Sequence, residues 1–560
     1  MGYTDYSVEH SPTATALDYT TSLEAEVERT KHHTYYGDDS PEKSPKGSGP
    51  KKDLAGPASS IEHSDSIIVT WDGPDDPENP KNWSFGYKWF ITIICSLLTL
   101  NVTYASSAPS TASFAISSQF HSSTEESYLV TSMFLVGYVF GPMFWGPGSE
   151  LVGRRPAMIF TFAIYTILHL GQALAQDMKT VIITRFFAGF FACSPLTNSS
   201  GVIADIWDPV YRGIATSVFS TTVFLGPVLG PVISGYIVVS HLGWRWVFWV
   251  MMIFADFCTA LGAVFIPETY APVLLAKKAR NATTASRLRA LDPEKNKNLY
   301  AEGEKIDWAP RAFLDRTILR PIRMLFVEPI LLLITVYISL VYGVIYAMFE
   351  AFPVIFVRIH HFTIQHDGLI FIGVGIGSVI ATLANIWLLR PYPRLLKEWR
   401  GFPPPEARLP SAMIGGPLLA ISIFLLGWTG NYESVPWYVP ALSTIPLGAS
   451  ISLVFMSCLS YLVDTYLMYS ASAFAANTMM RSIVGAAFPL FTVQMYEGMG
   501  VNWASTLIGG FSLLLAPMPF FFYKYGPRIR ANSQFAPCMV RSFFFVRGSS
   551  PYHLEAIDLS

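Results

Sequence analysis

Five ionisable side chains lie inside long apolar stretches of this chain: His169, Arg185, Asp256, Glu350 and Arg481. If these stretches cross a membrane, an unpaired charge at the bilayer centre costs at least ~2.5 to 3.5 kcal/mol, so each charge needs a partner or a function. A carboxyl group whose proton affinity depends on a nearby arginine can take up and release protons. We therefore take Arg185, Glu350 and Asp256 as candidates for proton coupling.

Each of these candidates has a simpler interpretation. Arg185 could be a structural arginine bonded to backbone carbonyls, and Glu350 could face water at the outer end of its helix. Asp256 and His169 could be interior polar groups that are satisfied by neighbours.

A dense charged cluster occupies residues 146–156, between two apolar stretches. Its Glu150 and Arg154 can form charge-assisted pairs in one state of a moving protein and break them in another. Asp205 and Asp464 end the fourth and tenth apolar stretches, which correspond if the chain is a repeat of two halves. We expect a conformational latch of Glu150, Arg154, Asp205 and Asp464, with simple anchoring of the arginines as the alternative.

The corresponding loop of the second half has fewer of the features found in residues 146–156. Arg390 and Arg394 keep the positive charge there, but the glycine pattern of residues 146–156 is lost. The latch should therefore be weaker in that half.

The fifth apolar stretch carries two Gly-Pro pairs four residues apart, which lie on one face of a helix. Glycine allows close contact between helices, and proline removes a backbone hydrogen bond. We predict a bent, closely packed helix, in which Gly230 meets a helix of the opposite half; an ordinary kinked packing helix is the alternative. The residues concerned are Gly226, Pro227, Gly230, Pro231 and Gly235.

Aromatic side chains recur at positions that could face a central cavity. We expect Tyr138, Tyr342, Tyr346 and Phe349 to line it together with Arg481. Such a lining would suit large, flat compounds that are apolar or cationic, through buried area and cation–π contact.

The composition places these residues in a membrane protein. The chain has 560 residues, of which 51% are hydrophobic and 14% charged, and its mean hydropathy is +0.37. A helical span needs roughly 20 apolar residues, and twelve such stretches can be found. They are 88–108, 127–146, 156–176, 180–203, 213–238, 246–266, 328–350, 367–389, 411–429, 437–463, 472–496 and 503–524.

The polar segments divide the chain into two bundles. We expect a disordered N-terminal tail (1–83), a first six-helix bundle (84–266), a central loop (267–327), a second bundle (328–524) and a C-terminal tail (525–560). Because lysine and arginine gather in the central loop and in the 2–3 and 8–9 loops, the positive-inside rule predicts that both tails and these loops are cytoplasmic. Residues 538–560 could be a lineage extension or a gene-model error.

Several functions are disfavoured by the sequence. Four of the five cysteines fall within spans, and no spacing suggests a disulfide framework or a metal site. The chain contains no phosphate-binding loop of the G-x-x-x-x-G-K-[ST] form, which argues against ATP-driven transport. We expect no cofactor, no covalent catalysis, no nucleic-acid partner and a monomer in the bilayer.

Three of these segments also resemble motifs of the major facilitator superfamily. Residues 146–156 are similar to its motif A, Arg185-Phe186-Phe187-Ala188-Gly189 to motif B, and residues 226–235 to motif C of the antiporter branches. Further matches, among them residues 71–83, Pro267–Pro272, 349–353, 461–464 and 523–530, resemble the fungal twelve-span drug:proton antiporters. The resemblance implies an all-α membrane protein of two six-helix bundles.

The same resemblance implies a function. A proton-coupled exporter of drugs, toxins, polyamines or a secondary metabolite is expected, in the plasma membrane or alternatively the vacuolar membrane. A proton-coupled nutrient importer and a non-transporting nutrient receptor are the alternatives. Motif C argues against the importer, and the short tails argue against the receptor.

Overall fold

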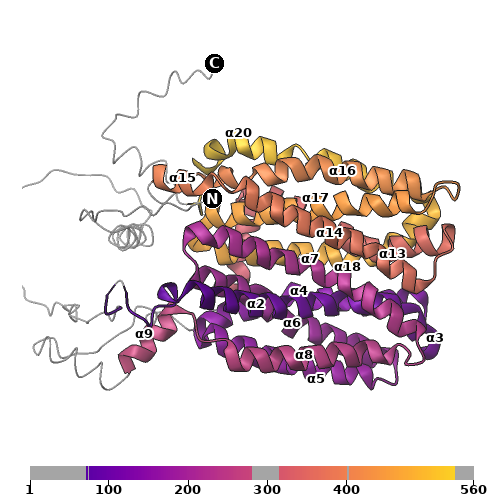
Figure 1. Ribbon diagram of the computed structural model, residues 1–560, viewed down its shortest axis with the longest axis horizontal. Coiled ribbons are helices and arrows are strands. Elements are labelled where there is room, and N and C mark those ends of the chain that lie inside the picture. Colours follow the sequence, from indigo (N-terminus) through magenta and orange to yellow (C-terminus); the bar gives the residue numbers. More distant parts are fainter. Residues whose placement is uncertain (1–70, 74, 281–314, 400–402, 532, 537–560) are drawn as a thin grey trace, which may run out of the picture.

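The computed structural model describes residues 71–73, 75–280, 315–399, 403–531 and 533–536. Long helices dominate these residues and run side by side in two groups (Figure 1). The first group consists of α2 (Phe85–Ser107), α4 (Thr124–Val152), α5 (Arg154–Ala173), α6 (Met178–Ile206), α7 (Pro209–Val239) and α8 (Arg245–Phe265). The second consists of α13 (Pro329–Phe352), α14 (Ile364–Leu388), α16 (Pro410–Gly430), α17 (Tyr438–Tyr466), α18 (Ser470–Met499), α19 (Val501–Leu515) and α20 (Met518–Ala531).

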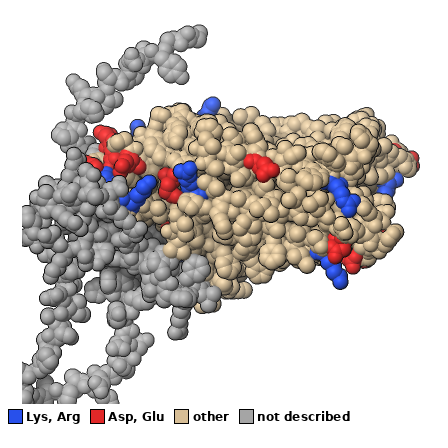
Figure 2. Space-filling view, turned by 90° about the horizontal axis from the view of Figure 1, so that it is seen from below, with Lys and Arg blue, Asp and Glu red and all other residues tan. Residues whose placement is uncertain are grey.

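Eleven spans in the described part of the chain are long and apolar enough to cross a membrane. The twelfth predicted span is α18, which has 30 residues and packs against α4 and α13. Its buried face carries polar residues, among them Asn477, Thr478 and Arg481, and they lower its hydropathy. In the space-filling view, charged side chains gather toward the two ends of the bundle, and the surface between them is mostly uncharged (Figure 2).

The last predicted span departs from a single helix. It is divided into α19 and α20 around Pro517, and the second part continues to Ala531, seven residues beyond the predicted end at 524. Proline has no N–H to donate within a helix, so a break at this position is expected from its chemistry.

The two halves use the same device to pack their helices closely. In the first half, a Cβ atom at Gly137 or Gly189 would collide with the backbone of the facing helix of the α4–α6 pair. In the second half, Gly377 and Gly448 play this part between α14 and α17. The matching seams are what a repeat of two six-helix units predicts.

Contacts between the halves run mainly along α7 with α14 and along α4 with α18. A Cβ atom at Gly368 of α14 would collide with the carbonyl group of Pro231, so α7 and α14 touch through their backbones. The Asn385 amide donates a hydrogen bond to Ser217 Oγ across the same interface, at 2.9 Å. A third link joins Ser106 Oγ of α2 to the Tyr346 hydroxyl of α13, at 2.8 Å.

Candidate functional site

A cavity of about 360 Å³ lies between the two halves. Its walls come from α4, α6 and α7 on one side and from α17 and α18 on the other. It extends from Arg481, in the interior, to Glu150, Arg154, Arg408 and Asp464 at the end of the bundle that we predict to be cytoplasmic. We call that part of the cavity its mouth.

Arg481 lies at the inner end of this cavity, on α18. The residue is only 2% exposed, and its Nε and Nη1 atoms have no hydrogen-bond partner among the described residues. Its guanidinium lies over the rings of Phe455, at 5.0 Å, and Tyr342, at 5.1 Å, measured to the ring centroids. Arg481 is one of the residues that line the cavity, and its role there stays a prediction.

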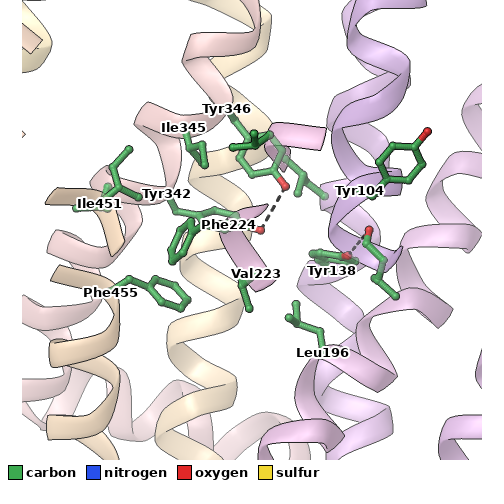
Figure 3. Packing of buried hydrophobic residues seen from close by; sticks show 14 of the residues in the cluster. Tyr104, Tyr138, Leu196, Val223, Phe224, Tyr342, Ile345, Tyr346, Ile451 and Phe455 are labelled. Atoms are coloured by element: carbon green, nitrogen blue, oxygen red, sulfur yellow. Dashed lines mark hydrogen bonds between the residues drawn. The ribbon is translucent and has the colours of Figure 1, made fainter. Parts of the chain in front are cut away.

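The other four predicted cavity residues are not among those that line this cavity. Tyr138, Tyr342, Tyr346 and Phe349 are buried in the packed region between the halves. Figure 3 shows Tyr138 on a helix of the first half and Tyr342, Tyr346 and Phe455 on helices of the second. The Tyr342 and Tyr346 hydroxyls lie 3.4 Å apart, and Tyr138 donates to the Val102 carbonyl at 3.3 Å.

Arg185 is fully buried, and backbone carbonyls satisfy it. Its Nε donates to Val130 O at 2.8 Å, its Nη1 to Ala105 O at 2.8 Å and its Nη2 to Ser106 O at 3.4 Å. Its guanidinium also lies 4.2 Å from the centroid of the Phe134 ring. This is the arrangement of a structural arginine, since its hydrogen bonds within the described part of the chain go to carbonyl groups and to no carboxylate.

Glu350 lies near the other end of the bundle, close to the end of α13. It is 7% exposed, and Asp367, in the first turn of α14, is 2% exposed. Glu350 Oε1 and Asp367 Oδ1 have no hydrogen-bond partner in the described part of the chain. The two carboxyls lie near enough to interact electrostatically. The alternative interpretation, in which Glu350 faces water, does not fit this conformation.

Aromatic rings next to the two acidic residues pack α13 against α14. Phe371, one helical turn after Asp367, packs on Phe349 with ring centroids 5.2 Å apart and on Phe352 at 4.6 Å. These two phenylalanines flank Glu350 in the sequence. The acidic pair consequently lies beside an apolar wall at the junction of α13 and α14.

Asp256 does not lie in the interior, where the sequence analysis placed it. Its side chain is exposed on the outside of α8, away from the interior and from the cavity. The 3.6-residue period explains the difference, because Ala255 and Cys258 occupy the buried face of the helix. His169 is in the interior as expected, with its Nδ1 atom 3.0 Å from Gln172 Oε1.

At the mouth, Arg154 gathers the acidic residues of the first half. Its guanidinium lies 3.5 Å from Asp205 and 3.8 Å from Glu150. Glu268 adds to this cluster, because its carboxylate accepts the backbone N–H groups of Arg154, at 2.9 Å, and Arg155, at 3.2 Å. An acidic group at these free N–H groups stabilises the start of α5.

Gly153 makes this arrangement possible. Its φ is +105°, and a Cβ atom there would collide with the Glu268 carboxylate. The residue therefore needs both the backbone freedom and the missing side chain of glycine.

The second half has a matching pair at the mouth, with an arginine that the sequence did not single out. Asp464 accepts from Arg408 Nε at 2.8 Å and from the Tyr392 hydroxyl at 3.2 Å, whereas Arg390 and Arg394 are exposed. Burial alone would lower the pKa of the Arg408 guanidinium, but the attraction of Asp464 and Tyr392 raises it above its usual value. The guanidinium lies 3.8 Å from the centroid of the Tyr392 ring.

The Gly-Pro pairs of α7 contact two different helices. Cβ atoms at Gly226 and Gly230 would collide with Thr103 and Ser107 of α2, in the same half. The prediction that Gly230 meets the opposite half is therefore wrong, because Gly226 and Gly230 lie on a different face of α7 from Pro231. Pro231 and Gly235 make the contacts with α14 of the opposite half.

Sequence reasoning missed Asp367, Arg408 as the partner of Asp464, and Glu268 as a cap. Asp367 had a recognisable signal, since it lies in the first turn of an apolar helix. Arg408 had none, because its pairing depends on how the 8–9 loop folds back. Among the described residues, no group of three or more His, Cys, Asp or Glu side chains could hold a metal ion.

Comparison with known proteins identifies the family. The model of the Major Facilitator Superfamily matches residues 90–489. The chain is 41% identical to the "Citrinin biosynthesis cluster MFS transporter" of Monascus ruber, over 84% of this chain and 93% of that protein. It is 40% identical to the "Ascochitine biosynthesis cluster MFS transporter" of Didymella fabae, over 84% and 90%.

Two further comparisons agree. A "Major facilitator superfamily multidrug transporter" of Aspergillus fumigatus is 39% identical, over 84% of this chain and 76% of that protein. The solved proton:xylose symporter XylE is similar in fold, with a TM-score of 0.58 and 18% identity, and the match covers 79% of this chain and 96% of that one. The chain therefore belongs to the Major Facilitator Superfamily, in its fungal drug-efflux family, and is a multi-pass membrane transporter.

Proposed function

We propose that this transporter exports an organic compound in exchange for protons. Relatives that are named as an efflux pump and a multidrug transporter support export. The cavity gives such a compound a path of entry, since it is bounded by the arginine-rich mouth that we predict to be cytoplasmic. A compound would enter from the cytoplasm in this conformation. We also propose that the protein acts as a monomer, in the plasma membrane, with both termini in the cytoplasm.

The observation that carries the proton coupling is the buried pair of Glu350 and Asp367. An ionised carboxylate without a partner is very unfavourable in an apolar interior, and two neighbouring ones are more so. A proton on at least one of them removes most of this cost. The charged groups Arg358 and Glu497 lie at the same end of the bundle, where they pair with each other.

This pair lies where the two halves meet at the end opposite the mouth. Glu350 lies two residues before the end of α13, and Asp367 precedes Gly368, whose backbone contacts Pro231 of α7. Opening of that end would expose both carboxyls to the outside medium. Closing it again around two ionised groups would be unfavourable, so proton uptake becomes a condition for the return to the conformation described here. The exchange is complete when this proton passes to the cytoplasm before the outer end opens again with substrate bound.

Neutral substitutions test the coupling. Glu350→Gln mimics the protonated acid, so the halves should still alternate while protons no longer control them. We expect this variant, and Asp367→Asn, to keep exchanging a fluorescent dye across vesicle membranes at equal concentrations. Both should lose uphill export of that dye driven by a pH gradient, by at least about tenfold.

A matched control is Glu497→Gln. Glu497 is half-exposed and pairs with Arg358 at the same end of the bundle, and its loss should leave uphill export near the wild-type rate. Uphill export by Glu350→Gln at the wild-type rate would remove this residue from the coupling mechanism. Wild-type export that continues after the proton gradient is collapsed would remove proton antiport altogether.

A further inference from the structure

We propose that the exported compound is an aromatic organic acid and that Arg481 binds its anionic group. This assignment rests on the proposed export function and narrows its substrate class. It also replaces the sequence-based expectation of apolar or cationic compounds.

The Arg481 side chain is a buried cation whose hydrogen-bond donors are not all used. Arginine stays protonated in proteins, and its guanidinium has five N–H donors in a planar fork. Two of its three nitrogen atoms are buried without an acceptor in the described part of the chain. A buried cation with unused donors is unfavourable unless something that is not part of the chain completes its bonding.

The negative charges around the cavity lie at its mouth. Three carboxylates line it, namely Glu150, Asp205 and Asp464. All three lie at the mouth and have an arginine partner there, at 3.8, 3.5 and 2.8 Å. No lining carboxylate belongs to the inner end, among the residues that the structure describes. The inner end therefore presents one positive charge without a counter-charge.

Apolar and aromatic side chains form part of the cavity walls. Phe219, Val223, Phe455 and Phe474 contribute apolar surface to the cavity. The Phe224 ring packs edge-on against Phe455, with centroids 4.8 Å apart, and holds it in place. About 360 Å³ is within the ordinary size range of small-molecule sites. A flat ring system could fill this space while its carboxylate forms a bidentate pair with the guanidinium.

A cationic substrate fits the same walls poorly. Its charge would face the Arg481 guanidinium across an apolar space, where repulsion between like charges is only weakly screened. The Arg481 guanidinium already covers one face of the Tyr342 ring and one face of the Phe455 ring. The cation–π contact expected from the sequence is therefore made within the protein.

The test uses three probes with one ring system and different charge: naphthoate, the neutral naphthamide and naphthylmethylammonium. Binding to the full-length purified protein in detergent is measured by calorimetry at one pH. We expect the wild type to bind naphthoate at least about tenfold more tightly than naphthamide, as for a hydrogen bond to a charged group. Naphthylmethylammonium should bind most weakly.

Two variants test whether Arg481 causes the preference for naphthoate over naphthamide. Arg481→Gln should bring the ratio of naphthoate to naphthamide affinity close to one, and Arg481→Lys should keep part of it because the charge remains. Lys397→Gln is the matched control, since it removes an exposed cation near the mouth that does not line the cavity. Its ratio should equal that of the wild type. Thermal unfolding of each variant shows whether it is folded.

The outcomes separate this inference from the proposed function. Binding in detergent involves no proton gradient, so a failure of proton coupling leaves the affinity ratio unchanged. A wild-type ratio near one, no binding of naphthoate, or tighter binding of the cation would overturn the assignment, whatever the variants do. An unchanged ratio in a folded Arg481→Gln protein would show that Arg481 only packs against its aromatic neighbours.

Discussion

Arg185 and Arg481 are both buried arginines on long helices, but their surroundings give them different properties. Arg185 is bonded to three carbonyl oxygens. One of them, Ala105 O, has Pro109 four residues later in the chain, and proline cannot donate the usual helical hydrogen bond. Arg185 therefore supplies a donor that the end of α2 lacks. Arg481 has no comparable acceptors among the described residues and faces the cavity.

Removal of the Arg185 side chain should consequently affect stability as well as transport. We expect Arg185→Ala to lower the free energy of unfolding by about 1 to 3 kcal/mol for each carbonyl left without a donor. Dye efflux should be abolished at equal abundance in the membrane. Thermal unfolding in detergent and efflux from cells give the two readouts.

The exposed pair of Arg358 and Glu497 provides the comparison for Arg185. Arg358→Ala should change stability little, because exposed ion pairs contribute about 0 to 1 kcal/mol. If Arg185→Ala matched Arg358→Ala in both assays, its three hydrogen bonds would be unimportant for fold and function alike.

At the scale of the helices, α7 uses its two faces for different purposes. The Gly230 face packs against α2 within the first half, and the Pro231 face meets Gly368 of α14 across the interface of the halves. An added methyl group on the first face should destabilise one bundle. On the second face it should separate the two bundles where the protein is closed.

We therefore expect Gly230→Ala and Gly368→Ala to fail in different ways. Gly230→Ala forces a Cβ atom against Ser107 and the backbone N of Ala108, and such overpacking costs about 1 to 3 kcal/mol of stability. Gly368→Ala should remain folded but leak protons. Acidification of proteoliposomes with an entrapped pH-sensitive dye measures the leak.

Gly510→Ala is a suitable control for both variants. Gly510 lies within α19, and a Cβ atom there has no heavy atom within 4 Å. A proton leak no greater in Gly368→Ala than in Gly510→Ala would mean that this contact does not seal the protein.

For the whole molecule, the sequence predicted an all-α membrane protein, the division of its long helices into two halves and the clustering of Glu150, Arg154 and Asp205. These features depend on apolar length and on charges close to helix ends, which are local properties. The partner of Asp464, the helix that faces Gly230 and the exposure of Asp256 could not be predicted in this way. Each depends on how a helix is rotated or how a loop returns, which only tertiary packing determines.

The two clusters at the mouth lead to a prediction about the whole transport cycle. Arg154 and Arg408 already pair within their own halves in this structure, where their cavity opens at the mouth. A latch that pairs only when the mouth is closed is therefore not what these contacts show, and we propose instead that the two clusters join when the halves close there. Arg154→Ala should then favour the conformation that is open at the mouth and slow turnover more than it weakens binding. A reporter cysteine, Ser460→Cys, in the cavity wall should react faster with an impermeant maleimide in inside-out vesicles.

The native thiols interfere little with this measurement, since Cys95, Cys193, Cys258 and Cys458 are buried. Cys538 lies outside the described residues and would be replaced by serine. Equal labelling rates with and without Arg154 would show that its ion pairs only hold the first half together and anchor the loop.

The lone positive charge of Arg481 at the inner end of the cavity has an electrical consequence for the cell. If a monovalent anion leaves while one proton enters, both movements carry positive charge inward. A membrane potential of about 100 mV, negative inside, would contribute about 2.3 kcal/mol for each of the two charges. The sum corresponds to roughly a 2,000-fold concentration ratio. Export of an acid by this protein would thus draw on the membrane voltage and continue where the outside medium is not acidic.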